Sequence, residues 1–242
     1  MTIIDLYNSR INDKEMSLSV SQYHSEINKS EMFNAKEFAF IGISLGNSYF
    51  SEERLELIFK AFSSNFKRVA VLLVDELSVH NYRVLGYDEK KTKKKLKANA
   101  NRAINRMSRA MEKTNTLHQK NNIEFYRWSD VEQFDTYHDV LKKITHLYET
   151  NSEFKDTIVQ ITKDVIEKYL HEQFCDAFLD ESKWYFLKEI AFGCCINEFF
   201  NEDKVLNCYY QDFKFYREFF ETNYMKIDNS KKQDFIIYHC SE

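Results

Sequence analysis

Apolar residues along this chain occur in two patterns, short continuous runs and longer segments with three- and four-residue spacing. The continuous runs predict strands over Phe38–Ile43, Arg68–Val74, Ile123–Arg127, Lys204–Tyr210 and Phe235–His239. The spaced segments predict helices over Glu52–Phe62, Asp88–Leu117, Ser129–Tyr148, Phe154–Leu170, Asp176–Ile196 and Asp212–Thr222. Strands that alternate with helices are typical of a parallel sheet covered by helices. We therefore expect an α/β fold, with a single doubly wound, mostly parallel, Rossmann-like sheet in residues 31–242 and a partly ordered N-terminal leader in residues 1–30.

Glycine is scarce, and its positions limit the kinds of nucleotide site that the sheet can hold. The four glycines are Gly42, Gly46, Gly86 and Gly193. They cannot supply a G-x-G-x-x-G fingerprint or a P-loop, both of which need closely spaced glycines before a helix. We therefore expect neither a dinucleotide nor ATP at the edge of this sheet.

Cysteine and histidine show no spacing that indicates a metal site. The five cysteines lack a C-x-x-C pair, and the seven histidines lack an H-E-x-x-H motif. We expect reduced thiols, no metal and no other cofactor. No apolar run is long enough to span a membrane. Together these features predict a cytoplasmic protein, and nothing in the pattern argues against a monomer.

The helix expected after Asp88 is strongly basic. Between Lys90 and Lys113 the chain has ten basic residues and one acid, a charge of +9 in a protein whose net charge is −4. Candidate contacts with a polyanion are Lys91, Lys94, Lys95, Arg102, Arg106 and Arg109. Like charges on one helix face repel each other, so a nucleic acid is the natural partner. A solvated run of charge is the alternative interpretation.

A serine marks the end of the first predicted strand. Gly42 and Gly46 lie on either side of Ser44, and a helix begins at Ser51. A side chain on such a strand-to-helix turn lies at the carboxyl edge of the sheet, where α/β folds bind their ligands. The alternative is a turn with no chemical role.

Further polar residues come near the end of the chain. Tyr185 and Glu189 are one helical turn apart and therefore share a helix face. A half-buried carboxyl group there has a raised pKa, which suits it to bind an ammonium group or to transfer protons. The predicted strand Lys204–Tyr210 ends in Tyr209 and Tyr210, and Asp212 follows. Taken alone, Tyr185 and Glu189 are better explained as surface residues of a helix.

These segments together resemble the cyclodipeptide synthases over about residues 38–220. The first segment, Gly42-Ile43-Ser44-Leu45-Gly46-Asn47-Ser48-Tyr49-Phe50, is similar to the family pattern Gly-Ile-Ser-x-x-Asn-Ser-x-Phe. The second is Tyr185-x-x-x-Glu189, and the third is Tyr209, twenty residues after Glu189. The resemblance implies a fold like the catalytic domain of class I aminoacyl-tRNA synthetases.

The resemblance also implies roles for individual residues. Ser44 matches the nucleophile that accepts the first aminoacyl group from an aminoacyl-tRNA. Tyr185 and Glu189 match the pair that holds the α-amino group of this aminoacyl group. Tyr209 matches the tyrosine that orients the intermediate and takes part in cyclisation. The implied reaction is a ping-pong synthesis of a cyclic dipeptide (diketopiperazine) through aminoacyl- and dipeptidyl-serine. The family precedent is a monomer that contacts tRNA through a basic helix.

Other positions around the serine matter for subgroup and substrate. Asn47, three residues after the serine, indicates the subgroup that carries asparagine there. Tyr210 departs from the glutamine or histidine common among relatives, and Leu45 and Ala191 replace frequent prolines. Gly42 and Asp212 are further candidates for contact with substrate. Phe40 and Leu72 are apolar candidates for the walls of the side-chain pocket, so we expect hydrophobic amino acids as substrates.

Three alternatives remain at this level. A serine hydrolase or acyltransferase would need a histidine partner for Ser44 and would leave the basic helix unexplained. A non-catalytic tRNA-binding protein would not need Tyr185, Glu189 and Tyr209. A true aminoacyl-tRNA synthetase would carry H-x-G-H and K-M-S-K-S signatures, which this chain lacks.

Overall fold

The computed structural model describes residues 4–11, 14–24, 37–118, 122–167, 175–212, 219 and 232–241. In these residues seven strands form one sheet in the order β1-β2-β7-β6-β3-β4-β5. The strands are β1 (Ile4–Ile11), β2 (Lys14–His24), β3 (Phe38–Ser44), β4 (Arg68–Val74), β5 (Ile123–Arg127), β6 (Lys204–Tyr209) and β7 (Lys232–Ser241). Strands β3 to β7 pair in parallel, and β1 and β2 are antiparallel. The expected mostly parallel α/β sheet is confirmed.

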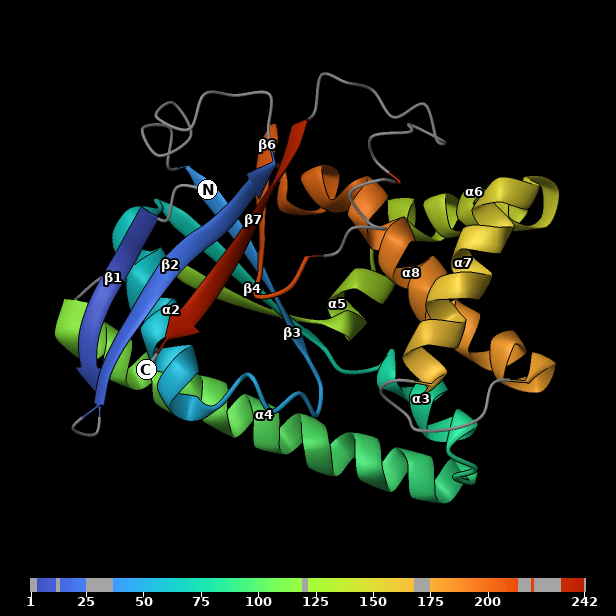
Figure 1. The fold of residues 1–242 in the computed structure, drawn as a ribbon, viewed down its shortest axis with the longest axis horizontal. Helices are drawn as coiled ribbons and strands as arrows, with labels where there is room; N and C mark the ends of the chain where they lie inside the picture. The colour runs from blue at the N-terminus through green and yellow to red at the C-terminus, as the bar shows by residue number, and fades with distance from the viewer. Residues whose placement is uncertain are drawn as a thin grey trace.

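Seven helices in the described residues connect and cover these strands (Figure 1). They are α2 (Glu52–Asn65), α3 (Ser78–Val84), α4 (Glu89–His118), α5 (Trp128–Glu132), α6 (Asp135–Thr150), α7 (Ser152–Val165) and α8 (Asp176–Phe200). Helix α3 was not expected from the sequence. The single helix expected over Ser129–Tyr148 is two helices, because the backbone at Phe134 is extended, with φ −88° and ψ 113°. Most of the helix expected over Asp212–Thr222 lies outside the described residues.

The N-terminal segment differs from the expected leader, because it contributes two strands to the sheet. Strand β2 pairs with β7, so that Leu18 lies opposite Cys240 and Val20 opposite Tyr238. Met16, Leu18 and Val20 are buried, while the serines between them are less so. This alternation is the period of a half-buried strand. Burial of the apolar side chains explains why β2 joins the sheet.

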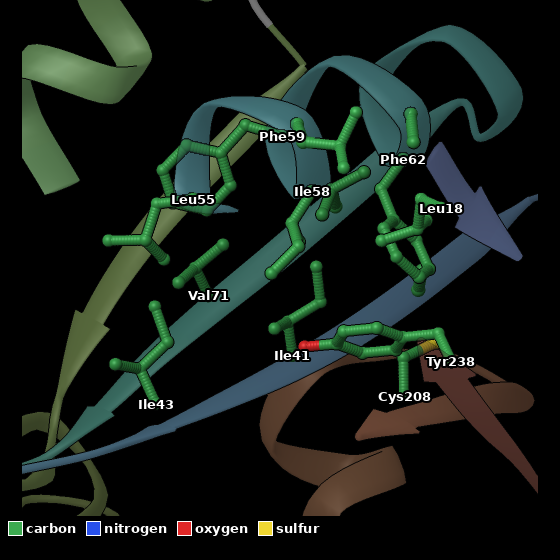
Figure 2. Close-up of a cluster of buried hydrophobic side chains, with 14 of the residues drawn as sticks. Leu18, Ile41, Ile43, Leu55, Ile58, Phe59, Phe62, Val71, Cys208 and Tyr238 are labelled. Carbon is green, nitrogen blue, oxygen red and sulfur yellow. The ribbon is translucent and has the colours of Figure 1, made fainter. Parts of the chain in front are cut away.

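The sheet separates two hydrophobic cores. On one face, helix α2 lies across β3 and β4, as the labelled side chains of Figure 2 show for Leu55, Ile58, Phe59 and Phe62 above Ile41 and Val71. The basic helix α4 closes the same core with Ala103, Met107 and Ala110. On the other face, helices α5 to α8 pack against Ala70, Leu72 and Val74. Residues of β4 thus alternate between the two cores, as period-two geometry requires.

The same alternation places the candidate nucleophile. In β3, Ala39, Ile41 and Ile43 belong to the core beneath α2. Phe40, Gly42 and Ser44 therefore face the opposite side of the sheet, towards α8, where a large cavity lies. Position 44 is also the last residue of β3, so its side chain lies at the carboxyl edge of the parallel strands.

Candidate active site

Ser44 ends β3 in a tight turn that leads into α2. The backbone N–H of Asn47 donates to the carbonyl of Ser44 at 3.5 Å. Gly46 has φ +76°, a left-handed conformation that a side chain would strain. Ser51 then caps α2 by accepting a hydrogen bond from the N–H of Arg54 at 3.3 Å. The expected strand–turn–helix arrangement around Ser44 is confirmed.

The hydroxyl of Ser44 is 2.9 Å from the hydroxyl of Tyr209, which lies 165 residues later in the chain. Strands β3 and β6 are neighbours in the sheet, so both side chains reach the same edge. Burial is the main reason why the pKa of Tyr209 lies well above its usual value. Tyr209 is therefore a neutral phenol at physiological pH, able to donate or accept a hydrogen bond at Ser44.

The cavity at this edge has a volume of about 1310 Å³. It brings together every residue that the sequence analysis assigned to catalysis or to the aminoacyl groups: Phe40, Gly42, Ser44, Asn47, Leu72, Tyr185, Glu189, Tyr209 and Asp212. These residues come from β3, β4, α8, β6 and the turns that follow the strands. Among the described residues that line it, the structure shows no histidine.

Glu189 and Tyr185 lie deep in this cavity on α8. Burial raises the pKa of Glu189 from its usual 4.5 to about 7. Burial, followed by the negative charge of Glu189, holds the pKa of Tyr185 well above its usual range, and a hydrogen-bonding contribution from Ser44 opposes this rise. Glu189 can therefore gain and lose a proton near neutral pH, whereas the phenol of Tyr185 keeps its proton.

The position occupied by Tyr210 has a clear structural explanation. Its hydroxyl accepts a hydrogen bond from Nδ2 of Asn47 at 2.6 Å. Its ring stacks on Tyr49, with 3.8 Å between the ring centroids and an angle of 12° between the planes. Asn47 also accepts from the N–H of Tyr49 at 2.9 Å, so the three residues lock the turn after Ser44. Sequence analysis noted Tyr210 only as a departure from the family pattern.

One wall of the cavity is apolar and aromatic. Phe40 packs against Phe192, with 5.8 Å between ring centroids, and Trp128 packs against Phe192 at the same distance. Leu72 lies beside them in the cavity lining. Phe192 and Trp128 were not singled out from the sequence. Their only signal was membership of apolar stripes, which does not distinguish a cavity wall from an ordinary core.

The basic helix α4 runs along the lower edge of the view in Figure 1, with its N-terminal end beside α3. Its apolar stripe is buried, and its basic residues other than half-buried Arg106 are exposed. Two of these residues pair with α2: Arg109 Nε lies 2.7 Å and Lys113 Nζ 3.1 Å from the carboxylate of Glu52. We call Arg109 and Lys113 the paired end of α4.

Other basic residues of α4 remain available to a partner. Lys94, Lys95 and Arg102 are exposed, and within the described part of the chain they form no ion pair that the structure records. We call these three residues the open basic face. Lys91 lies over the ring of Tyr87, 3.6 Å from its centroid. Arg106 is half-buried, and its Nε has no hydrogen-bond partner among the described residues.

Within the described residues, no group of three or more histidine, cysteine, aspartate or glutamate side chains is arranged to hold a metal ion. No helix in the same part of the chain is long and apolar enough to cross a membrane.

Known proteins are similar to this chain over most of its length. The model of the family "Cyclodipeptide synthase" matches residues 23–239. The chain is 24% identical over 216 residues to the Cyclo(L-leucyl-L-leucyl) synthase of Staphylococcus haemolyticus (strain JCSC1435), which covers 87% of this chain and 90% of that protein. The crystal structure of a cyclodipeptide synthase from Bacillus thermoamylovorans superimposes with a TM-score of 0.77 at 20% identity, covering 100% of this chain and 96% of that one.

The fold is also similar to a class I aminoacyl-tRNA synthetase. The tyrosyl-tRNA synthetase of Archaeoglobus fulgidus superimposes with a TM-score of 0.55 at 12% identity, over 90% of this chain and 60% of that one. At this identity the likeness concerns the fold alone, and it agrees with the expected synthetase-like sheet. The family match, in contrast, extends over most of the chain. This protein therefore belongs to the cyclodipeptide synthase family, and it is an enzyme that makes cyclic dipeptides.

Proposed function

We propose that this enzyme takes its two amino acids from aminoacyl-tRNAs and joins them by a ping-pong mechanism on Ser44. The observation that carries this proposal is the contact of Ser44 with Tyr209 at the sheet edge, in a cavity that also holds Tyr185 and Glu189. An aminoacyl-tRNA is an activated ester, so the reaction needs no ATP, and we propose that it needs no metal.

In the first step, Oγ of Ser44 attacks the ester carbonyl of the first aminoacyl-tRNA. A bond forms between Oγ and the carbonyl carbon, and the bond from that carbon to the ribose oxygen breaks. The proton of Ser44 passes to the departing ribose oxygen, and we propose that the neighbouring ribose hydroxyl relays it. Tyr209 holds the serine hydroxyl in position, while Tyr185 and ionised Glu189 bind the α-ammonium group.

In the second step, the amine held on Ser44 attacks the ester carbonyl of a second aminoacyl-tRNA. The amine must first lose a proton, and Glu189, with a pKa of about 7, is suited to accept it. A peptide bond forms, the second tRNA leaves with a proton, and a dipeptidyl group remains on Ser44. The new terminal amine then attacks the Ser44 ester, which closes the six-membered ring and returns the proton to Oγ.

We further propose hydrophobic amino acids as substrates. The wall formed by Phe40, Leu72, Trp128 and Phe192 offers apolar contacts and few hydrogen-bonding groups. One named relative is a synthase of cyclo(L-leucyl-L-leucyl), which supports the same chemistry. Apolar pockets separate substrates that differ by one methylene by only about 10–200-fold. A mixture of leucine-, methionine- and phenylalanine-containing products is therefore expected.

The basic helix supports tRNA as the source of the aminoacyl groups. The open basic face presents three cations along one side of α4, and none of them forms an ion pair within the described part of the chain. Helix α4 has 30 residues and is therefore roughly 45 Å long. Such a row of positive charge can follow several phosphates of an acceptor stem. Helix α4 also contributes Asn99 to the cavity lining, so nucleic acid on this helix lies next to the site of acyl transfer.

The decisive experiment follows the covalent intermediate. Leucyl-tRNA is mixed with the wild-type enzyme, the reaction is stopped in acid, and the intact mass is measured. A mass increment of one leucyl group on Ser44, together with diketopiperazine in the product fraction, is expected. The variant Ser44→Ala should show neither. Product formation by wild-type enzyme without any adduct at short times would refute the covalent mechanism.

A hydrolase acting through Ser44 is the competing chemistry. It would require a general base beside the serine, usually a histidine. The described residues of the cavity include none, and the nearest hydroxyl partner of Ser44 is a phenol whose pKa is raised. Release of free leucine from leucyl-tRNA without cyclic product would favour the hydrolase.

A further inference from the structure

Two tyrosines form a small aromatic array where α3 meets α4, at the mouth of the cavity. The rings of Tyr82 and Tyr87 are nearly parallel, with an angle of 8° and 6.0 Å between their centroids. Lys91 Nζ lies 3.6 Å from the centroid of Tyr87, and Nδ2 of Asn99 donates to the hydroxyl of Tyr82 at 2.6 Å. Tyr82 and Asn99 line the cavity that contains Ser44. The array therefore connects the cavity with the basic helix.

The turn that carries this array is firmly built. Gly86 has φ +71°, which allows the chain to reverse between the helices without strain. The N–H of Tyr87 donates to the carbonyl of Tyr82 at 3.1 Å, which brings the two residues together. The carboxylate of Asp88 accepts from the N–H of Lys91 at 2.7 Å and caps α4. The rings are partly exposed and held by local hydrogen bonds, and no established step of the reaction uses them.

Charge is unevenly distributed around the array. On α3 and α4, the acid Glu89 is paired with Arg83 and Lys93, and lysines outnumber the acids. Exposed Asp164 and Glu167, at and after the end of α7, line the same cavity. A polyanion is therefore attracted to the basic residues of α4 and repelled by these two carboxylates.

We propose that the Tyr82–Tyr87 array is a stacking site for an unpaired base at the 3′ end of the aminoacyl-tRNA, with Lys91 contacting the adjacent phosphate. This inference rests on the proposed use of aminoacyl-tRNA. A stem bound along α4 lies beside Asn99, which lines the cavity of Ser44 and contacts Tyr82, so its aminoacyl end can pass the array on the way to Ser44. Proteins that bind single strands combine a basic groove with aromatic rings on which bases stack. Lysine beside such a ring supplies the cation for the neighbouring phosphate.

The test compares two tRNAs on the wild type and on Tyr87→Leu, with Tyr87→Phe as the control variant. Dissociation constants of deacylated tRNA are measured for the wild type and for Tyr87→Leu, with intact tRNA and with tRNA that lacks its unpaired 3′ nucleotides. Loss of one stacked base is expected to weaken binding of intact tRNA by about 5- to 150-fold. The truncated tRNA should bind both proteins equally. Tyr87→Phe keeps the ring and should stay within about threefold of the wild type. Equal losses for both tRNAs, or no loss, would overturn the inference.

A second measurement uses the wild-type protein alone and so does not depend on the folding of a variant. Deacylated tRNA carries 2-aminopurine in place of one base at each unpaired 3′ position in turn. Stacking on a tyrosine ring is expected to change the fluorescence of at least one position on binding, and titration without a change at any position would refute the stacking site. These measurements read binding only. Failure of Ser44 acylation by leucyl-tRNA would count against the proposed function instead.

Discussion

The buried carboxyl group of Glu189 leads to a prediction in which stability and activity move in opposite directions. Its side chain lies in the cavity beside Tyr185 of α8 and Tyr209 of β6. The pKa values of both phenols are raised by burial, so neither loses its proton between pH 5 and 8. The isosteric change Glu189→Gln removes the ionisable group and preserves its size. We expect this variant to be inactive and yet more stable than the wild type at pH 8.

The magnitude follows from the pKa. Burial raises it from the usual 4.5 to about 7, so the folded state holds this proton more tightly than the unfolded chain does. Ionisation on raising the pH therefore favours the unfolded state, and the loss of stability develops as the pH rises between these two values. At 1.36 kcal/mol per pKa unit, the cost reaches about 3 kcal/mol at pH 8. At pH 5 it is less than about 1 kcal/mol.

Urea unfolding of both proteins at pH 5 and pH 8 measures this effect, since the comparison cancels all other titrating groups. The free energy of unfolding of Glu189→Gln minus that of the wild type should rise by about 2–3 kcal/mol between the two pH values. In the same pH range, cyclic dipeptide formation by the wild type should increase with a midpoint near pH 7. A stability difference that does not vary with pH would refute the assigned burial of this charge.

Three further predictions concern Tyr209, the turn at Gly46, and the open basic face and paired end of α4. Tyr209→Phe removes the hydroxyl partner of Ser44 and should slow acylation by about 10–100-fold, with the melting temperature almost unchanged. Quenched-flow mass spectrometry measures the acylation rate, and an unchanged rate would contradict the positioning role of Tyr209. Gly46→Ala forces a side chain into φ +76° and should lower the free energy of unfolding by about 1–2 kcal/mol, whereas a neutral result in urea would show that the turn relaxes. Replacing the residues of the open basic face with glutamine should reduce the slope of log affinity for tRNA against log salt by about one per lost phosphate contact. The same change at the paired end should alter this slope little, because Arg109 and Lys113 are already paired with Glu52. Equal effects of the two sets of changes would show that the ion pairs with α2 open on binding.

Many of the helices and strands were predictable because the spacing of apolar residues along the chain indicates them. Strands β3 and β4 have apolar residues on both faces, and α4 has one apolar and one charged face. Such patterns are set by the geometry of residues that are neighbours in the chain. The turn around Ser44 was equally predictable, because its positive-φ position is occupied by glycine, which the sequence shows directly. The same holds for Tyr185 and Glu189, whose spacing alone places them on one face of α8.

Other features depend on which helices and strands contact each other, and no short stretch of the sequence indicates these contacts. The alternation in β2 is visible in Met16, Leu18 and Val20, but only the pairing of β2 with β7 makes it part of the sheet. The predicted tRNA contact Arg109 turns out to be paired with Glu52 on α2. Tyr210 gains its role from Asn47, 163 residues earlier. Such contacts join distant segments, so their existence follows from the packing of the whole domain.

The sequence by itself thus determined the alternating elements, the serine turn and the amphipathic basic helix, because each is encoded within a few neighbouring residues. The tertiary structure decided the electrostatics of the site. Glu189 has a pKa of about 7 because the surrounding strands and helices bury it. Ser44 meets Tyr209 because β3 and β6 are adjacent in the sheet. Desolvation and strand adjacency are properties of the assembled fold, and no short stretch of sequence contains them.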